Sequence, residues 1–388
     1  MDIISPTPLL KIVEIQGRGR SLVSTQPLKP GQIILKDTPL LLYPASSSKT
    51  NTFCSNCYKL IIQSPIPCPE CIFSFFCTSN CHSISLSSSH TPFVCQSLTH
   101  FIKNLSFNSN LLLDQQVQVF YLISAYNLAL INPSSFRVLL SLQGDSSFVS
   151  ENDVYLLHSV VSTICPSSTN LGEFRLSKEL TGALLAKDKV NAFGLMEPFV
   201  CARERGVRAY GIYPMASFFN HDCLPNACRF EYVDSDVSSG SNNTDMIVRV
   251  IHDVDEGREI CLSYFPVNFK YSERQQRLKE DYGFSCSCDR CVVEANWSDQ
   301  EDDDAMDNEG EEIEEEEEDE AMEEDEVIGN GEVEERDQDF PHAYFFIRYM
   351  CNKENCWGTL APLPPSDATP STIMECNVCG NLSKSDEL

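Results

Sequence analysis

Cysteine and histidine residues recur at the spacing of metal ligands between residues 51 and 95. Eight candidate ligands fall within 42 residues, and structural zinc takes four thiolate or imidazole ligands, so the segment has the ligands for two tetrahedral zinc sites. Scattered free cysteines are the plain alternative, which this dense spacing disfavours. We expect an interleaved pairing, with one ion bound by Cys54, Cys57, Cys77 and Cys81 and the other by Cys68, Cys71, His90 and Cys95.

A second cluster, Cys286, Cys288 and Cys291, supplies three ligands and so lacks one for a closed site. Cys223 is the natural fourth ligand, about 60 residues upstream, in the stretch "FFNHDCLPNACRF" of residues 218–230. A catalytic zinc with an open position is the competing interpretation, but no acidic or histidine partner beside these cysteines favours it. We therefore expect a structural zinc ion that ties two distant segments together.

The last cysteines form a third set near the end of the chain, in "CNKENC" and "CNVC", with a proline-rich loop between them. A module this small has too small an apolar core to be stable without a cross-link such as a bound metal ion. We therefore expect a small zinc ribbon whose ligands are Cys351, Cys356, Cys376 and Cys379. The remaining cysteines stand in apolar or strand-like surroundings and fit buried hydrophobic residues better than ligands; they are Cys165, Cys201, Cys228 and Cys261.

Composition separates one acidic segment from an otherwise nearly neutral chain. The 388 residues carry a formal net charge of −29, and residues 299–339 hold 25 Asp and Glu against a single Arg, which leaves about −5 for the rest. Phosphate contacts need clustered Lys and Arg, so the lack of a basic stripe argues against direct nucleic-acid binding and favours a basic protein partner. Such an acidic run cannot bury enough apolar surface to fold, so we expect a disordered linker.

The start of the chain and its cysteine count suggest a soluble intracellular protein. The first residues lack a basic leader followed by an apolar run, so we expect no signal peptide. The longest apolar stretch, "VQVFYLISAYNLALI", is interrupted by Gln118, Ser124 and Asn127 and is too short to span a bilayer, so we expect no membrane association. In a reducing compartment, 19 cysteines, an odd number, are better explained by metal than by disulfides.

Strands and helices must hold these candidate ligands in place. Residues 9–43 alternate short apolar runs with turn signals, and strand-like patterns return at "RFEYVD", "MIVRVIHDV" and "EICLSYF". Longer apolar periodicity between residues 98 and 190 predicts several buried helices, and "SERQQRLKEDYG" predicts a helix before the second cysteine cluster.

Four stretches of the sequence resemble one known family. The cysteine-rich segment resembles a MYND zinc finger inserted near the start of a SET domain. The stretches "NHDCLPN", "GREICLSYF" and "YGFSCSCDRC" resemble the SET core and post-SET segment of the SET-and-MYND (SMYD) protein-lysine methyltransferases. The resemblance covers about residues 10–295, with agreement in order, spacing and residue type. It implies an α+β SET fold of small sheets with a knotted C-terminal segment, an inserted finger and a helical insert.

The resemblance and the composition together divide the chain into seven parts. They are 9–50, the N-terminal part of the SET domain; 51–95, the finger; 96–190, the helical insert; 191–268, the SET core; 269–295, the post-SET zinc segment; 296–340, the acidic linker; and 341–388, the cysteine-rich C-terminal module. The last two parts stand where many animal relatives have a helical-repeat lobe over the substrate cleft, so the resemblance does not imply a substrate.

Carried over position by position, the resemblance implies a binding site for S-adenosylmethionine. A glycine turn would wrap its methionine end, because backbone can approach closely there and arginine can meet the carboxylate; the matching residues are Arg18, Gly19 and Arg20. Asn191, Asn220 and His221 match residues that hydrogen-bond the cofactor, and Phe284 matches the aromatic ring that packs on the adenine. The alternatives are a satisfied buried polar pair for Asn220 and His221 and a core aromatic for Phe284.

The resemblance also implies the groups that act on the substrate lysine. Tyr264 matches the catalytic tyrosine, which also borders the cofactor, and Tyr213 matches the wall of the lysine channel, with a core aromatic as its alternative. Methyl transfer from a sulfonium to an amine is an in-line displacement, so alignment supplies most of the advantage. The amine must be neutral, which an apolar channel beside the positive sulfonium favours. The zinc ions would take no part in this step.

The implied activity is S-adenosylmethionine-dependent methylation of a lysine in a partner protein, which is a histone or another protein. The competing class is a non-catalytic scaffold that binds partner proteins, such as a proline-rich peptide, through the MYND finger. A zinc-rich DNA-binding regulator is disfavoured by the missing basic face. Asn220, His221, Tyr264 and Phe284 favour the enzyme, because a scaffold has no need for all four. We expect a monomer in the nucleus, the cytoplasm or both.

Overall fold

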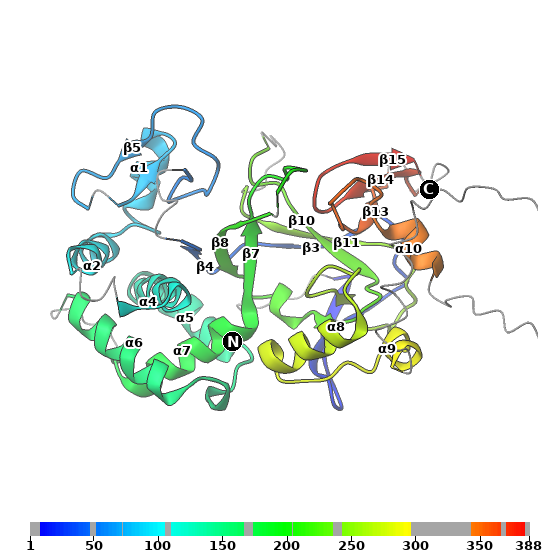
Figure 1. The fold of residues 1–388 in the computed structure, drawn as a ribbon, viewed down its shortest axis with the longest axis horizontal. Helices are drawn as coiled ribbons and strands as arrows, with labels where there is room; N and C mark the ends of the chain where they lie inside the picture. The colour runs from blue at the N-terminus through cyan, green and yellow to red at the C-terminus, as the bar shows by residue number, and fades with distance from the viewer. Residues whose placement is uncertain are drawn as a thin grey trace, which may run out of the picture.

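The computed structural model describes residues 8–46, 52–71, 73–104, 110–166, 174–203, 205–235, 243–295, 343–365 and 370–384. The acidic linker predicted over residues 296–340 lies outside them. Figure 1 shows the finger and the helices between residues 92 and 191 on one side of the molecule, small sheets in the centre, and the C-terminal module with the helices between residues 271 and 294 on the other side.

Four small sheets of the described residues build the central part. The hairpin of β1 (Leu10–Ile15) and β2 (Gly19–Ser24) is antiparallel, and a second sheet has the order β10 (Ala227–Glu231), β11 (Met246–Val250), β3 (Ile33–Asp37). A third sheet has the order β4 (Leu41–Pro44), β8 (Val207–Ile212), β7 (Ala192–Met196). In the fourth, β9 (Asn220–His221) pairs in parallel with β12 (Cys261–Leu262). The predicted α+β class with small sheets is confirmed.

The helical insert packs against the third of these sheets. Its helices are α2 (Pro92–Lys103), α4 (Leu113–Ile131), α5 (Pro133–Ser141), α6 (Glu151–Ile164) and α7 (Lys178–Asn191), with the short 3-10 helix η1 (Ser146–Phe148) before α6. A proline at the first position and the Asn132 side chain, which accepts from the Ser135 N–H, start α5. The apolar core of the insert includes Tyr121 of α4 and extends to Tyr43 of β4. This shared core fixes the insert on the sheets.

The SET core has a separate apolar cluster, which includes Leu22, Phe219 and Val248. After the SET core the chain continues with α8 (Tyr271–Arg277), a π-helical turn η3 (Leu278–Tyr282) and α9 (Asp289–Glu294). Gly283, with φ of 77°, ends the turn in the left-handed region that glycine tolerates. The post-SET segment is therefore a compact arm beside the sheets rather than another strand.

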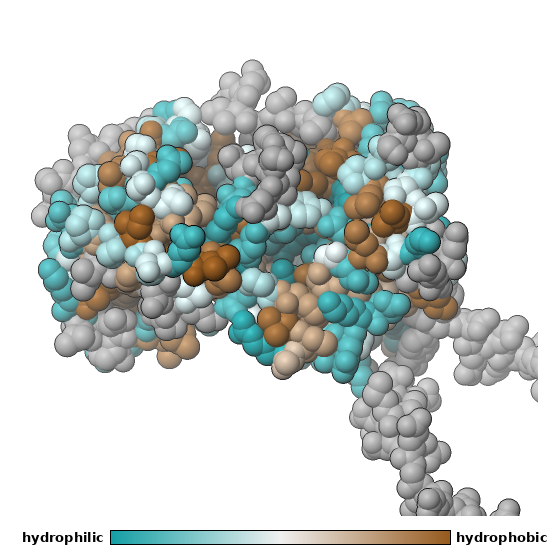
Figure 2. Space-filling model, turned by 90° about the horizontal axis from the view of Figure 1, so that it is seen from above, coloured by the Kyte–Doolittle hydropathy of each residue, from teal (hydrophilic) through white to brown (hydrophobic). Residues whose placement is uncertain are grey.

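Two small cysteine-rich units complete the molecule. The finger contains β5 (Ile66–Pro67), β6 (Phe75–Phe76) and α1 (Ser79–Ser85). The C-terminal module contains α10 (Ala343–Tyr349) and a three-stranded sheet of β13 (Leu360–Pro362), β14 (Ile373–Cys376) and β15 (Leu382–Lys384). Seen from above in Figure 2, the surface is hollowed between the side that carries the finger and the side that carries the C-terminal module, and hydrophilic residues line the hollow.

Among the described residues, no helix combines the length and the apolar character that crossing a bilayer requires.

Candidate functional site

The finger brings its eight candidate ligands together as two separate sets of four, in the interleaved pairing expected from the sequence. In the first set the sulfurs of Cys57 and Cys77 lie 3.7 Å apart, and in the second the sulfurs of Cys68 and Cys95 lie 3.7 Å apart. The Nε2 atom of His90 lies 3.2 Å from the Cys68 sulfur. Four ligands at zinc–sulfur distances of about 2.3 Å from one ion place their sulfurs about 3.8 Å apart. The donor sets therefore fit tetrahedral zinc.

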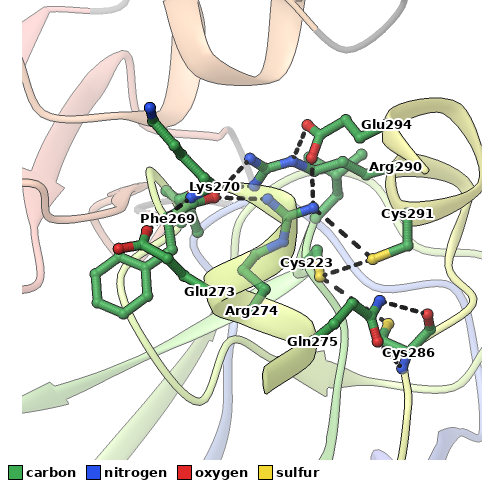
Figure 3. Close-up of polar contacts among 12 residues, drawn as sticks. Cys223, Phe269, Lys270, Glu273, Arg274, Gln275, Cys286, Arg290, Cys291 and Glu294 are labelled. Carbon is green, nitrogen blue, oxygen red and sulfur yellow. Dashed lines mark hydrogen bonds and ion pairs between the residues drawn. The ribbon is translucent and has the colours of Figure 1, made fainter. Parts of the chain in front are cut away.

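The second predicted cluster also assembles, and Cys223 is its fourth member. The ligand atoms of Cys223, Cys286, Cys288 and Cys291 all lie within 4.8 Å of one another. The sulfur of Cys223 is 3.5 Å from that of Cys291 and 4.0 Å from that of Cys286, as Figure 3 shows. Cys223 is fully buried. Four converging thiols without an acidic or imidazole ligand suit a structural ion with no open position.

The C-terminal set closes in the same way. The Cys351 and Cys379 sulfurs lie 3.8 Å apart, and the Cys356 and Cys376 sulfurs lie 3.4 Å apart. All four ligand atoms lie within 4.8 Å of one another.

Backbone geometry supplies an observation that does not depend on cysteine spacing. The residue that directly follows a ligand cysteine takes a positive φ at Tyr58 (55°), Trp357 (51°) and Gly380 (68°). Tyrosine and tryptophan rarely adopt this left-handed conformation, so something other than local preference must impose it. A tight turn that directs backbone and sulfur toward one ion is such a cause, and it occurs in both the finger and the C-terminal module.

Three distant segments meet around Asn220, a predicted cofactor residue. Its amide nitrogen lies 3.2 Å from the Arg18 carbonyl oxygen, 2.7 Å from Ser21 Oγ and 2.8 Å from Glu259 Oε1. Glu259 also forms an ion pair with Arg18 at 2.7 Å, and the Arg18 guanidinium donates to the His221 carbonyl at 3.1 Å. Gly19 of the same turn has φ of 72° and open space where a Cβ would stand. The predicted glycine turn and the Asn-His strand therefore form one hydrogen-bonded unit with room beside it.

The imidazole of His221 connects Tyr264 with the buried cysteines. Its Nδ1 accepts from the Tyr264 backbone N–H at 3.2 Å, so its Nε2 carries the proton and points at the Cys223 sulfur at 3.3 Å. Burial lowers the pKa of His221 to about 3, so the ring is neutral and this tautomer persists. The parallel β9–β12 pairing, which places Leu262 opposite His221, sets this arrangement.

The Tyr264 hydroxyl is fixed by one hydrogen bond. It donates to the Phe219 carbonyl oxygen at 2.9 Å, which leaves its oxygen lone pairs available as acceptors. Burial raises the pKa of Tyr264, so the phenol is protonated at neutral pH. The ring of Tyr282 lies beside it, with 4.8 Å between ring centroids. Sequence reasoning passed over Tyr282, although it stands two residues before Phe284 in the same motif.

Tyr213, the predicted wall of the lysine channel, lies in the apolar cluster of the SET core. It is fully buried, its hydroxyl donates to the Thr244 carbonyl oxygen at 2.7 Å, and its ring meets Phe193 edge-on at 5.8 Å. Phe193 is half-buried and follows Asn191 closely in the chain. Phe193, whose ring Tyr213 supports, is thus the second aromatic residue, after Tyr282, that was not predicted from the sequence.

The end of α5 and the loop after it hold the two remaining cofactor residues predicted from the turn and from "NAFG". Arg20 donates to the Ser141 carbonyl at 3.0 Å, and both hydrogens of the Asn191 amide go to carbonyls, those of Gln143 and Lys187, each at 2.7 Å. The oxygen of the Asn191 amide is therefore the atom that remains available to accept a hydrogen bond from a cofactor. No spacing rule for cofactor residues pointed to this loop.

The same loop reaches the residue next to Phe284. A Cβ on Gly283 would meet the ring of Phe148 at 2.7 Å, and the φ of 77° also disfavours any residue other than glycine there. Phe284 itself is 38% exposed, with its ring 6.5 Å from that of Tyr282. The loop and the post-SET segment thus approach each other beside the predicted adenine position.

The sequence matches the family described as SET domain over residues 19–265. It is 52% identical to an Arabidopsis thaliana protein named "Histone-lysine N-methyltransferase ASHR2", over 99% of this chain and 97% of that protein. It is 22% identical to a Dictyostelium discoideum protein named as SET and MYND domain-containing, over 76% of this chain and 84% of that protein.

One similar solved structure is described as the SET domain of LSMT bound to lysine and AdoHcy. It is 13% identical and covers 73% of this chain and 54% of its own, with a TM-score of 0.33. The family match spans more than half of the chain, and the Arabidopsis relative is 52% identical over nearly all of it, so each of these two shows the family. The matched range includes Asn220, His221 and Tyr264, which meet in the structure. The chain belongs to the SET domain family, among relatives of the SET-and-MYND type.

Proposed function

We propose that this protein is an S-adenosylmethionine-dependent protein-lysine N-methyltransferase. The observation that carries the proposal is the joining of Arg18, Asn220, His221 and Tyr264, from three distant parts of the chain, beside an open glycine turn. Two relatives support it by name, because the Arabidopsis protein is called a histone-lysine N-methyltransferase and the other carries the SET and MYND description.

The residues divide the work of binding the cofactor. Arg18 and the backbone around Gly19 would receive its methionine end, with Glu259 holding the guanidinium in place. Asn220 and Asn191 would accept hydrogen bonds from its polar groups through their amide oxygens, Arg20 would hold the end of α5 against it, and Phe284 would cover the adenine. When bound, S-adenosylmethionine supplies an activated methyl group on a sulfonium.

The lysine would approach between aromatic rings. Tyr264 holds its hydroxyl oxygen in one position through the Phe219 carbonyl, so that oxygen can accept a hydrogen bond from the substrate amine and align it. Tyr282 would form one wall beside Tyr264, and Phe193 another, with Tyr213 supporting Phe193 from behind. Apolar walls disfavour an ammonium ion, so the amine is kept in the neutral form that can attack.

Zinc is proposed as a structural cofactor at all four clusters. The ligand sets, sulfur separations and positive-φ turns favour it over free cysteines. At the Cys223 cluster the ion would hold the Asn-His strand against the segment that carries Phe284, which keeps the cofactor pocket assembled. None of the ions would contact the reacting atoms.

The proposed substrate is a protein with an accessible lysine, with histones as the first candidates because a relative is named for them. We also propose that the protein is a monomer that acts in the nucleus, the cytoplasm or both, and that the finger binds proline-rich peptides. A scaffold that works only through the finger is the competing class.

The test is incubation of the zinc-loaded protein with methyl-labelled cofactor and a panel that includes histones, followed by mass-spectrometric mapping of methylated lysines. Elemental analysis of the same sample should give about four zinc ions per chain. Methylation of at least one panel protein at defined lysines supports the enzyme. Cofactor binding without methylation of any protein would favour the scaffold.

A further inference from the structure

We propose that Arg274 is the charge partner of the zinc centre at Cys223, Cys286, Cys288 and Cys291. We further propose that Glu294 and Arg290 make the stability of this centre depend on the docked C-terminal module. The inference rests on the zinc proposed above and adds three positioning residues that lie behind the ligands, on α8 and α9 (Figure 3).

Arg274 is a buried cation directed at the cysteines. Its side chain is fully buried, and its Nη2 lies 3.8 Å from the Cys291 sulfur. Its Nη1 donates to the Phe269 carbonyl at 2.6 Å. Burial by itself would lower the pKa of Arg274, but Glu294 and the sulfurs of Cys223 and Cys291 raise it above its usual value. A buried guanidinium is tolerated only with negative partners, and the sulfurs are among them.

The charges around Arg274 do not balance without the sulfurs. The two oxygens of Glu294 are shared, one bound to Arg274 and the other to Arg290 Nε at 2.6 Å. Arg290 and Glu294 are each only 5% exposed. Two guanidinium groups thus face one carboxylate, which leaves one positive charge for the cysteines. Four thiolates around Zn²⁺ carry an excess of two negative charges, so a nearby cation in this dry surrounding stabilises the ligand set.

The second arginine connects this group with the C-terminal module. The Arg290 guanidinium lies 4.7 Å from the ring centroid of Phe346 on α10 and donates to the Val267 carbonyl at 2.5 Å. Val267 belongs to the apolar cluster that also contains Phe345 of α10. The Phe269 carbonyl accepts from both arginines. Undocking α10 would therefore let water reach Arg290, weaken its hold on Glu294 and loosen Arg274 behind the zinc ligands.

The experiment measures the alkylation rate of each cysteine in the full-length, zinc-loaded protein, with iodoacetamide as the probe and peptide mass spectrometry as the readout. In Arg274→Gln, Cys286, Cys288 and Cys291 should react about tenfold faster or more, as expected when a group behind metal ligands is lost. The cysteines of the finger should keep their rates. Arg274→Lys, which retains the charge, should recover part of the protection. Phe346→Ala should accelerate the same three cysteines less than Arg274→Gln does.

Matched controls lie on the same helices. Arg277 of α8 is 47% exposed on its side chain and pairs with Asp281, and Tyr344 of α10 is 62% exposed. Arg277→Gln and Tyr344→Ala should therefore leave the three rates unchanged. A protected parent with unchanged rates in Arg274→Gln overturns the charge-partner role alone, and unchanged rates in Phe346→Ala overturn the link to the module. An unprotected parent overturns both the inference and the zinc assignment on which it rests.

Discussion

The finger and the C-terminal module are each fixed to the SET core through a buried arginine of the core. The two anchoring arginines differ in whether the core or the module supplies the carboxylate that pairs with them. For the finger, Arg208 of β8 pairs with Asp234 of the core at 2.6 Å and lies over the ring of Phe53 in the finger at 4.8 Å. For the C-terminal module, Arg249 of β11 pairs with Glu375 of the module at 2.6 Å and lies over Phe230 of the core at 3.5 Å.

The difference concerns where the negative charge comes from. If the finger moves away, Arg208 keeps its carboxylate, and its Nε still donates to the Met196 carbonyl at 2.8 Å. If the C-terminal module moves away, Arg249 loses the carboxylate, and its Nε already has no hydrogen-bond partner among the described residues. An unpaired buried charge is strongly destabilising. The SET core should therefore depend on the C-terminal module more than on the finger.

The largest expected effect comes from Tyr264, which lies in the SET core and in neither module. Tyr264→Phe removes the hydroxyl that aligns the amine, and loss of such a group costs on the order of 3 kcal/mol, or about a hundredfold in rate. Cofactor affinity should stay within a few-fold of the parent, and zinc content should not change, because phenylalanine keeps the ring and its packing. Methylation kinetics, a cofactor-binding titration and elemental analysis measure the three quantities.

Tyr155→Phe is the control, since Tyr155 is 67% exposed and distant in sequence from every predicted site residue. It should methylate at the parent rate. Equal rates for the Tyr264 variant and the parent would make Tyr264 only a core aromatic.

The next effect compares the two anchors directly. Glu375→Gln leaves Arg249 buried without a carboxylate and should lower the free energy of unfolding by about 3 kcal/mol. Asp234→Asn should cost about 1 kcal/mol, because its side chain is 35% exposed and Arg208 keeps two carbonyl acceptors. Denaturant unfolding of the zinc-loaded variants measures both values. Equal losses would mean that the direction of the anchor has no energetic consequence.

A third comparison uses Trp357 of the C-terminal module and Tyr58 of the finger, each of which directly follows a ligand cysteine. Trp357 is 49% exposed at φ of 51°, so Trp357→Gly should relieve strain and stabilise the protein by about 1 kcal/mol. Tyr58 has the same backbone conformation but is buried, so Tyr58→Gly should instead destabilise it by about 2 kcal/mol, since the lost packing outweighs the relief. Thermal unfolding gives the two signs. A stabilising Tyr58→Gly would show that the packing of its ring in the apolar cluster of the SET core contributes less than the backbone strain.

The smallest effect is a pH dependence in the SET core. Asp37 accepts from the backbone N–H groups of Met215 and Ala216, each at 2.8 Å, and burial raises its pKa to about 6 from 3.8. The folded protein thus binds this proton more tightly than the unfolded chain, so the contribution of Asp37 is most favourable at low pH and is lost as pH rises through 6. Between pH 8 and pH 5.5 the parent should gain about 1 kcal/mol relative to Asp37→Asn.

Unfolding free energies of the parent and of Asp37→Asn at the two pH values measure that gain. Asp253, an exposed carboxylate paired with Lys29, gives the matched control, and Asp253→Asn should follow the parent at both pH values. A constant difference between parent and Asp37→Asn would show that Asp37 is already ionised at pH 5.5.

Residue type and spacing were enough to predict the parts of the site that metal chemistry constrains. Cys223 could be predicted because the post-SET cluster lacked a fourth ligand, and the interleaved finger followed from eight ligands in order. The surroundings of Asn191 and Tyr213 could not be predicted. Whether an amide faces a cofactor or the carbonyl of Gln143, and whether a phenol lines a channel or binds the Thr244 carbonyl, depends on backbone positions that no local pattern encodes.

The docking of the C-terminal module also could not be predicted from the sequence. Arg249 stands in a strand with a regular apolar pattern, and Glu375 stands between two cysteine ligands and a hydrophobic run. The sequence around either residue does not identify the other as its partner, because a charge pair between distant segments depends on how the folded surfaces pack together. The fold class could be predicted from motifs and patterning, but the contacts between its modules could not.

The Arg249–Glu375 pair also sets an order of events during synthesis. The two residues are separated by 126 positions, so at ribosomal rates of 5–20 residues per second the arginine waits about 6 to 25 seconds for its partner. During that time β11 cannot bury its guanidinium at low cost. The nascent chain should therefore keep this part of its SET core open to water, and to chaperones, until the last strands have left the ribosome.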